Sequence, residues 1–193
     1  MLIGVLAIQG GFEAHVLKFE ELGAAVREVR TPTGLEDLDG LVVPGGESTT
    51  IVKGIAAAGL EGAIRGHHEA GKPTFGTCAG MIVCDQDHLG LLDVTTRRNA
   101  FGRQLQSFEA DLEVEGIGDE PLRAVFIRAP WVERCGDAVD VLAAYGDHPV
   151  AVREGDVLAC AFHPELTDDS RMHALFMAMT TRTRDDASKG AKT

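Results

Sequence analysis

The first part of the chain alternates between short aliphatic runs and segments with helical spacing of apolar residues. The run from Leu2 to Ile8 is almost entirely aliphatic, which is typical of a strand buried on both faces of a parallel sheet. Phe12, Val16 and Phe19 then recur at helical spacing. The next elements are expected as strand 25–29, strand 40–43, helix 48–58, helix 60–70 and strand 73–76. This alternation predicts an α/β fold with three layers, in which helices flank a mostly parallel central sheet.

The second half of the chain is richer in predicted strands. They are expected over 89–94, 105–114, 124–127, 139–145, 150–153 and 157–162. Some of them are expected to form additional antiparallel strands beside the main sheet. A helix over 169–180 should close a single domain that spans residues 1–181, whereas the polar tail 182–193 is expected to be disordered.

Composition narrows the class of protein. A chain of 193 residues with 45% apolar residues fits one domain with a substantial core. The net charge of −12 argues against a protein that binds nucleic acid. The four cysteines show no C-x-x-C spacing, so neither a zinc site nor a disulfide framework is indicated. The chain has no basic leader and no apolar run long enough to span a bilayer, so a cytoplasmic location is expected.

Cys78 lies between the predicted strand 73–76 and a helix that is expected to begin directly after it. Gly76 and Gly80 lie close to it on either side. The arrangement is like the strand–turn–helix elbow that exposes the nucleophile of serine hydrolases. The positive end of the following helix favours the thiolate. The motif favours a nucleophilic cysteine, although by itself it leaves open a buried structural cysteine.

His163, Pro164 and Glu165 follow the last predicted strand. Proline favours an extended conformation in the residue before it, and residues two apart in an extended segment point to the same side. Glu165 is therefore expected to lie beside His163, where a carboxylate orients the imidazole and stabilises its charged form. By itself the segment could be a surface turn with a solvated histidine. Together with Cys78 it predicts a nucleophile, a base and an orienting group.

A glycine turn, Pro44-Gly-Gly-Glu-Ser-Thr-Thr, follows the predicted strand 40–43 and opens a helix that Ser48 is expected to cap. Free backbone N–H groups in such a turn suit an anion. The spacing of a phosphate-binding loop and its lysine are missing. Since a thiol nucleophile needs donors aimed at a tetrahedral oxyanion, an oxyanion hole fits the turn better.

Seven blocks, in order along the chain, together resemble one family. They are Ile8–Gly10, Pro44–Thr50, Phe75–Gly80, Arg98–Gln104, Ser107–Leu112, Val125–Pro130 and Phe162–Thr167. The cysteine elbow with His-Pro-Glu is similar to the triad-type (class I) glutamine amidotransferases, which have a flavodoxin-like fold. The blocks Arg-Asn-Ala-Phe-Gly-Arg-Gln and Phe-Ile-Arg-Ala-Pro resemble, more specifically, the glutaminase subunits of pyridoxal 5′-phosphate synthases. The resemblance extends from Met1 to about Thr180.

The resemblance implies hydrolysis of L-glutamine to L-glutamate and ammonia, without a metal or an organic cofactor. It implies that Cys78, His163 and Glu165 form the catalytic triad. The backbone N–H groups of Gly46 and Ala79 would form the oxyanion hole. The glutamine-binding positions implied by the family are Gly46, Glu47, Ser48, Arg98, Ile127 and Arg128.

The resemblance also implies a partner. Ammonia would pass through a protein tunnel to a synthase subunit, a (β/α)₈ barrel in a large hetero-oligomer, where a pentose phosphate and a triose phosphate complete pyridoxal 5′-phosphate. Family members become active on docking near Gln9 and Gly10, so we expect an incompletely formed oxyanion hole in the free subunit. The segment from Cys84 to Leu89 is shorter than is usual in the family, and the helix after Cys78 is therefore expected to end early.

Three other functions are compatible with parts of these patterns. The chain could supply ammonia to a different synthase, such as one that forms imidazole glycerol phosphate. It could be a DJ-1-like cysteine hydrolase, although such a protein would not need His163 and Glu165. It could also be a silent regulatory subunit, which the presence of all three triad residues disfavours.

Overall fold

The structure is a computed structural model that describes residues 1–101 and 107–190, with only the backbone for 184–190. Within this part of the chain, the largest sheet has seven strands in the order β2-β1-β3-β4-β11-β10-β9. The first five strands of this order run parallel, and the last two pair antiparallel. Their bounds are β1 Leu2–Leu6, β2 Ala25–Val29, β3 Gly40–Val43, β4 Thr74–Thr77, β9 Asp140–Tyr145, β10 His148–Glu154 and β11 Val157–Cys160.

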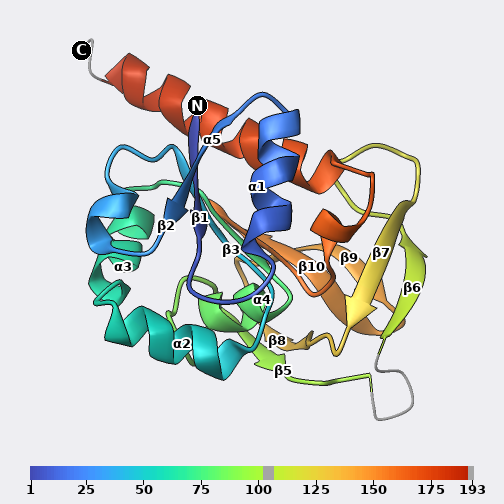
Figure 1. Cartoon of the computed structure of the whole chain (residues 1–193). Helices are drawn as coiled ribbons and strands as arrows, with labels where there is room; N and C mark the ends of the chain where they lie inside the picture. The colour runs from blue at the N-terminus through green and yellow to red at the C-terminus, as the bar shows by residue number, and fades with distance from the viewer. Residues whose placement is uncertain (102–106, 191–193) are drawn as a thin grey trace.

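Helices flank this sheet in two groups (Figure 1). One group contains α1 and α5, which meet through the rings of Phe19 and Phe176. In the other group, α4 packs on β3, β4, β11 and α2. The bounds of the helices are α1 Phe12–Glu21, α2 Ser48–Ala57, α3 Glu61–Glu69, α4 Ala79–Cys84 and α5 Arg171–Gly190, with 3₁₀ turns η1 Pro32–Leu35 and η2 Pro164–Leu166. The predicted α/β fold, with a mostly parallel sheet flanked by helices, is therefore confirmed.

Two antiparallel ribbons lie beside the main sheet. One pairs β5 (Val94–Arg97) with β8 (Trp131–Cys135), and the other pairs β6 (Ser107–Leu112) with β7 (Leu122–Ile127). The additional antiparallel strands were expected, but β8 was not, because only Val132 of this strand is fully buried and its sequence has no clear alternation. Residues 105 and 106 of a predicted strand lie outside the described residues.

The predicted strand over 89–94 was wrong. The chain turns through this region instead, and β5 begins only at Val94. The turn is organised by the buried side chain of Asp85, which accepts hydrogen bonds from the Asp87 N–H and the Thr96 hydroxyl and contacts His88. Helix α4 ends at Cys84, directly before this turn, as the short segment after it predicted.

The last helix is longer than the sequence indicated. Helix α5 continues to Gly190 rather than ending at residue 180, so most of the tail that was expected to be disordered is helical, and 191–193 lie outside the described residues. The hydroxyl of Thr180 lies 3.1 Å from the sulfur of Met1, which joins this helix to the start of β1. Within the described residues, no helix is both long and apolar enough to cross a membrane. The domain boundary at residue 181 stays a prediction.

Candidate active site

Cys78 occupies the turn that joins β4 to α4. Its φ of 49° and ψ of −108° place a non-glycine residue in a region that L-residues rarely adopt, a conformation that costs of the order of 1–3 kcal/mol and is common at active sites. The Cys78 N–H donates to the Cys160 carbonyl at 2.8 Å, so the turn begins directly at the sheet. Only 6% of the residue is exposed. The predicted elbow is therefore present, with its side chain held in a strained backbone.

Gly80 allows α4 to begin this close to the end of β3. A Cβ atom at Gly80 would collide with the backbone carbonyl oxygen of Val43. Because backbone atoms cannot move aside as a flexible side chain can, a larger residue would push the helix away from the sheet. Gly80, two residues after the cysteine, thus sets the distance between the cysteine turn and the glycine turn at Pro44–Gly46.

His163 follows β11 and is held by two contacts. Its backbone N–H donates to the Val125 carbonyl at 2.8 Å, and its Nδ1 lies 2.7 Å from Oε1 of Glu165. The expected pairing of histidine and glutamate is present, but the expected extended segment was wrong. Glu165 lies in the 3₁₀ turn η2, because Pro164 takes the first position of that turn. The turn brings the carboxylate back to the imidazole that precedes it.

The imidazole of His163 also meets Cys78. A Cβ placed on Gly45 would lie 2.7 Å from Cε1 of His163 and 3.2 Å from Cβ of Cys78, so both side chains border one point beside the glycine turn. Burial by itself would lower the pKa of His163, but side-chain hydrogen bonds with Cys78 and Glu165 outweigh it and raise the pKa to about 10. The charged imidazolium is thus the favoured form at neutral pH.

Glu165 is the buried anion of the group. Burial would raise the pKa of its carboxyl, but the hydrogen bond with His163 and the neighbouring imidazoles outweigh this effect and lower the pKa below its ordinary value. Glu165 is only 6% exposed and lies behind His163 as seen from Cys78. Sulfur, imidazole and carboxylate therefore lie next to one another in the order expected for a nucleophile, a base and an orienting group.

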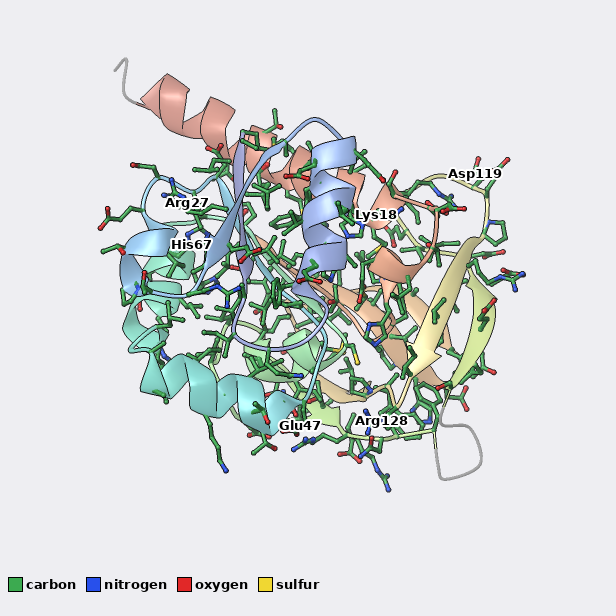
Figure 2. All side chains as sticks on the ribbon, viewed as in Figure 1. Lys18, Arg27, Glu47, His67, Asp119 and Arg128 are labelled. Atoms are coloured by element: carbon green, nitrogen blue, oxygen red, sulfur yellow. The ribbon has the colours of Figure 1, made fainter. Side chains whose placement is uncertain are left out.

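A cavity of about 360 Å³ lies in front of the sulfur. The predicted site residues that line it are Gly46, Glu47, Ser48, Cys78, Ala79, Arg98, Ile127, Arg128 and His163. Figure 2 shows Glu47, at the start of α2, and Arg128, after β7, along the same edge of the molecule. Glu165 does not line the cavity, because His163 lies between them. The predicted residues that line the cavity are thus brought to one place from five segments of the chain.

Glu47, and not Ser48, is the N-cap of α2, so the predicted cap was one residue late. The Glu47 carboxylate accepts hydrogen bonds from the backbone N–H groups of Thr49 and Thr50. The hydroxyl of Thr50 together with these N–H groups lowers the pKa of Glu47 to about 2. Among the described residues, the buried hydroxyl of Ser48 has no hydrogen-bond partner. The residue itself lines the cavity.

The glycine turn is fixed by hydrogen bonds on both sides. The Gly45 N–H donates to Oγ1 of Thr77 at 3.1 Å, and the Gly45 carbonyl accepts from the Gly11 N–H at 3.0 Å. Because the peptide is planar and trans, the Gly46 N–H points away from Gly11. The side chain of Gln9 accepts the Glu47 N–H at 2.8 Å. The assignment of the Gly46 and Ala79 N–H groups to an oxyanion hole stays a prediction.

Several residues of the site were not predicted as site residues, although Gln9 was expected near the docking surface. Gln9 and Asn99 line the cavity, whereas Thr77 and His15 lie behind it. The position of Gln9 near the carboxyl end of β1 was a signal, since ligands bind outside the carboxyl ends of parallel strands. His15 falls on the same helical face as Phe12 and Phe19, which is the face that packs on the sheet.

Comparisons with known proteins found similar sequences over most of the chain. A model of the SNO glutamine amidotransferase family matches residues 5–182. Two relatives named pyridoxal 5′-phosphate synthase subunit PdxT are similar to the chain. The protein from Frankia alni is 53% identical over 91% of this chain and 92% of its own length. The protein from Niallia circulans is 51% identical over 95% of this chain and 100% of its own length.

Solved structures are similar as well. A crystal structure described as a glutamine amidotransferase has a TM-score of 0.88 and 48% identity, and the match covers 93% of this chain and 98% of that one. The structure of PurLQS from Thermotoga maritima has a TM-score of 0.73 with 18% identity, covering 92% of this chain and 97% of that one. At this low identity, the second match shows the shared fold only.

Proposed function

The chain belongs to the SNO glutamine amidotransferase family, and we propose that it is the glutaminase subunit of a pyridoxal 5′-phosphate synthase. The observation that carries the proposal is the Cys78–His163–Glu165 series at the cavity, in a chain about half identical to proteins of that name. A DJ-1-like hydrolase would have no use for the imidazole and carboxylate that are built around this sulfur.

The proposed reaction follows from the order of the three side chains. The Cys78 thiolate attacks the carboxamide carbon of glutamine and forms a tetrahedral oxyanion. Because Nδ1 of His163 is held by Glu165, Nε2 faces the sulfur and gives its proton to the departing ammonia. The C–N bond breaks and a thioester remains on Cys78. Water, activated by the now neutral imidazole, hydrolyses the thioester, releases glutamate and restores the thiolate–imidazolium pair.

The proposed oxyanion hole consists of the backbone N–H groups of Gly46 and Ala79. Removal of one such donor typically costs about 10²–10³ in rate. Their positions beside Cys78 support the proposal, because both residues line the same cavity. We expect the hole to be completed only when the synthase subunit docks, since Gln9 and Gly10 border the glycine turn that carries one of the donors.

Glutamine binding is proposed for Gly46, Glu47, Ser48, Arg98, Ile127 and Arg128, all of which line the cavity. Free glutamine carries an α-carboxylate and an α-ammonium group, so its site needs a cation or N–H donors and an acceptor. Arg98 offers the cation, and the Ile127 carbonyl offers an acceptor that lies 3.9 Å from the Cys78 sulfur. The unpaired hydroxyl of Ser48 offers one more hydrogen bond.

The proposed partner is the synthase subunit, for which we expect a barrel fold and a large hetero-oligomer that receives ammonia through a tunnel. The proposed reaction needs neither a metal nor an organic cofactor, because the nucleophile and proton donor are both side chains of this chain. We propose a cytoplasmic location for the complex, in line with the four cysteines, all of which are free thiols.

The experiment that tests this proposal measures glutamate formed from glutamine by the purified chain, alone and with the synthase subunit of pyridoxal 5′-phosphate synthase. We expect strong stimulation by that subunit and none by the synthase subunit that forms imidazole glycerol phosphate. Cys78→Ala should abolish the activity. Cys84→Ala is the matched control, because Cys84 is a fully buried thiol whose burial raises its pKa to about 12. Equal activity of the wild type and Cys78→Ala would contradict the proposal.

A further inference from the structure

Two buried histidines lie behind the triad, and the proposed reaction does not use them. His15 comes from α1 and His173 from α5, and both are fully buried. Nδ1 of His15 lies 3.0 Å from Nε2 of His173. On its other side, Nε2 of His15 lies 3.1 Å from Oγ1 of Thr77 and 3.4 Å from Oε2 of Glu165. The series of polar groups thus continues from His163 through Glu165 into the core.

The surroundings of the two imidazoles are apolar. The ring of His173 lies 5.0 Å from that of Phe19 and 6.0 Å from that of Phe75, both in edge-on contact. Burial lowers the pKa of His15 and lowers that of His173 to about 3. Both imidazoles are therefore neutral at neutral pH. Because a buried polar group is unfavourable unless it is paired, two adjacent histidines here call for a specific role.

The positions of the hydrogen atoms follow from the partners available. If Nε2 of His15 carries the hydrogen, it donates to Oγ1 of Thr77 at 3.1 Å and lies 3.4 Å from the second carboxylate oxygen of Glu165, which has no hydrogen-bond partner among the described residues. Nδ1 then accepts from Nε2–H of His173. Nδ1 of His173, which has no partner among the described residues, is left as a buried acceptor.

The opposite tautomer is less favourable at both ends. The lone pair on Nε2 of His15 would face the carboxylate oxygen Oε2 of Glu165 at 3.4 Å. His173 would carry its hydrogen on Nδ1, where a buried donor would have no acceptor in the described part of the chain. Leaving a buried donor unpaired costs about 1–3 kcal/mol. Although the Thr77 hydroxyl could donate to Nε2 in this tautomer, the unpaired donor of His173 and the nearby carboxylate of Glu165 favour the Nε2–H form of His15.

We propose that His15 is a positioning residue of the glutaminase reaction, in which its Nε2–H holds the second oxygen of Glu165 while His173 fixes its tautomer. This inference rests on the proposed function. With Oε2 held by His15, the other oxygen of Glu165 is directed at Nδ1 of His163 at 2.7 Å. A hydrogen bond to a charged group corresponds to about ten- to hundredfold in rate if it acts on the chemical step.

Thr77 connects the same group to the glycine turn. Its Oγ1 accepts the Gly45 N–H at 3.1 Å and faces Nε2 of His15. Thr77 is also the residue before Cys78, at the end of β4. Loss of the His15 N–H would therefore disturb the orientation of Glu165 and the support of the Gly45–Gly46 peptide together. Because both the orientation of Glu165 and the support of this peptide affect the chemical step, we expect the loss to lower kcat.

The test compares His15→Leu with His15→Gln in the complex with the synthase subunit. A glutamine side chain places an N–H donor near the position of Nε2, whereas leucine places none. We expect His15→Leu to lower kcat by about ten- to hundredfold with little change in KM for glutamine, and His15→Gln to recover most of the loss. His67→Leu is the matched control, since His67 is a buried histidine of α3 that faces the Pro73 carbonyl. Its kcat should stay at the wild-type level.

Equal kcat values for folded His15→Leu and wild type would overturn the positioning role. Equally reduced kcat values for His15→Gln and His15→Leu would also overturn it. A wild type that forms no glutamate with the synthase subunit would overturn the proposed function instead. Should His15→Leu not fold, ¹⁵N NMR of the wild-type complex decides: a His15 resonance of the Nε2–H tautomer supports the inference, and an Nδ1–H or imidazolium signal overturns it.

Discussion

Glu47 and Arg98 pair at the edge of the cavity, where the guanidinium NH2 group donates to Oε1 of the carboxylate at 2.8 Å. A second guanidinium nitrogen donates to the hydroxyl of Thr49 at 3.1 Å. Both side chains are about half exposed. The same carboxylate caps α2, so the cation is tied to the start of the helix that follows the glycine turn. A substrate carboxylate would thus meet an arginine that is already oriented.

This pairing predicts an effect of Arg98 on binding rather than on chemistry. Arg98→Gln should raise KM for glutamine by about tenfold or more, because a hydrogen bond to a charged group contributes about 1.5–3 kcal/mol, with a smaller change in kcat. Arg97→Gln is a matched control, since Arg97 pairs with Glu133 at 3.7 Å and lies over the ring of Trp131. Steady-state kinetics of both variants check the prediction. A larger effect at Arg97 than at Arg98 would refute it.

Glu165 should control the charge of His163. The carboxylate stabilises the imidazolium, so Glu165→Gln should lower the pKa of His163 from its value of about 10 and reduce kcat. NMR titration of the His163 ring in both proteins measures this directly. The imidazolium signal of the wild type should persist above neutral pH and disappear as the pH rises through about 10. A His163 ring that titrates at the same pH in both proteins would argue against the role given to Glu165.

The backbone strain at Cys78 predicts an unusual order of stability. Glycine adopts a positive φ without penalty, so Cys78→Gly should relieve the strain at φ 49° that Cys78→Ala retains. Although glycine is ordinarily less stabilising than alanine by about 0.5–1 kcal/mol, the glycine variant should here be more stable, by about 1 kcal/mol. Urea unfolding of the two inactive variants compares them without interference from activity. An alanine variant of equal or greater stability would show that the turn is unstrained.

The buried histidines predict loss of stability in acid. The folded-state pKa values of His67, about 4, and His173, about 3, lie below the ordinary value of 6.5 because burial disfavours the charged form. The unfolded chain then binds protons first as the pH falls. Their stabilising effect is full above about pH 6.5 and decreases toward about pH 4, with a slope of up to about 1.4 kcal/mol per pH unit for each histidine. His163 acts in the opposite sense, with a contribution that is lost as the pH rises through about 10.

Urea unfolding over this acidic range, with the wild type and His67→Gln, measures the effect. The variant should show a shallower decline of the free energy of unfolding with falling pH, because one proton-binding group of the unfolded state is removed. An identical decline in both proteins would mean that His67 is protonated in the folded state as well. His67 lies in α3, away from the cysteine turn, so activity near neutral pH should be unaffected.

Much of the fold could be predicted from the local pattern of apolar residues in the sequence. The bounds of β2 and β3 match those predicted for 25–29 and 40–43, and α2 differs from the predicted helix 48–58 by one residue at one end. Buried parallel strands appear in the sequence as continuous apolar runs, and amphipathic helices appear as apolar residues at helical spacing. The second half was less readable, because Asp85 replaces the expected strand at 89–94 with a turn and β8 has little buried surface.

That Cys78 lies near the His163–Glu165 pair could be predicted for the same reason, since both stand at the end of a buried strand. The groups around these three residues could not be predicted. His15 and His173 are 158 residues apart and meet only because α1 and α5 pack together. Glu47 is the N-cap because its side chain accepts hydrogen bonds from the first N–H groups of α2. From the sequence alone, Ser48 was an equally reasonable candidate for the N-cap. Such contacts depend on the tertiary structure, and no periodic pattern of residues in the sequence predicts them.

The most direct test of the central claim traps the covalent intermediate. The complex with the synthase subunit is mixed with glutamine, quenched in acid within one turnover and digested, and the cysteine peptides are analysed by mass spectrometry. We predict a γ-glutamyl thioester on the peptide that contains Cys78, which persists longer in a variant that slows hydrolysis of the thioester. A γ-glutamyl group found only on Cys84, Cys135 or Cys160, or glutamate formed at full rate by Cys78→Ala, would contradict the account.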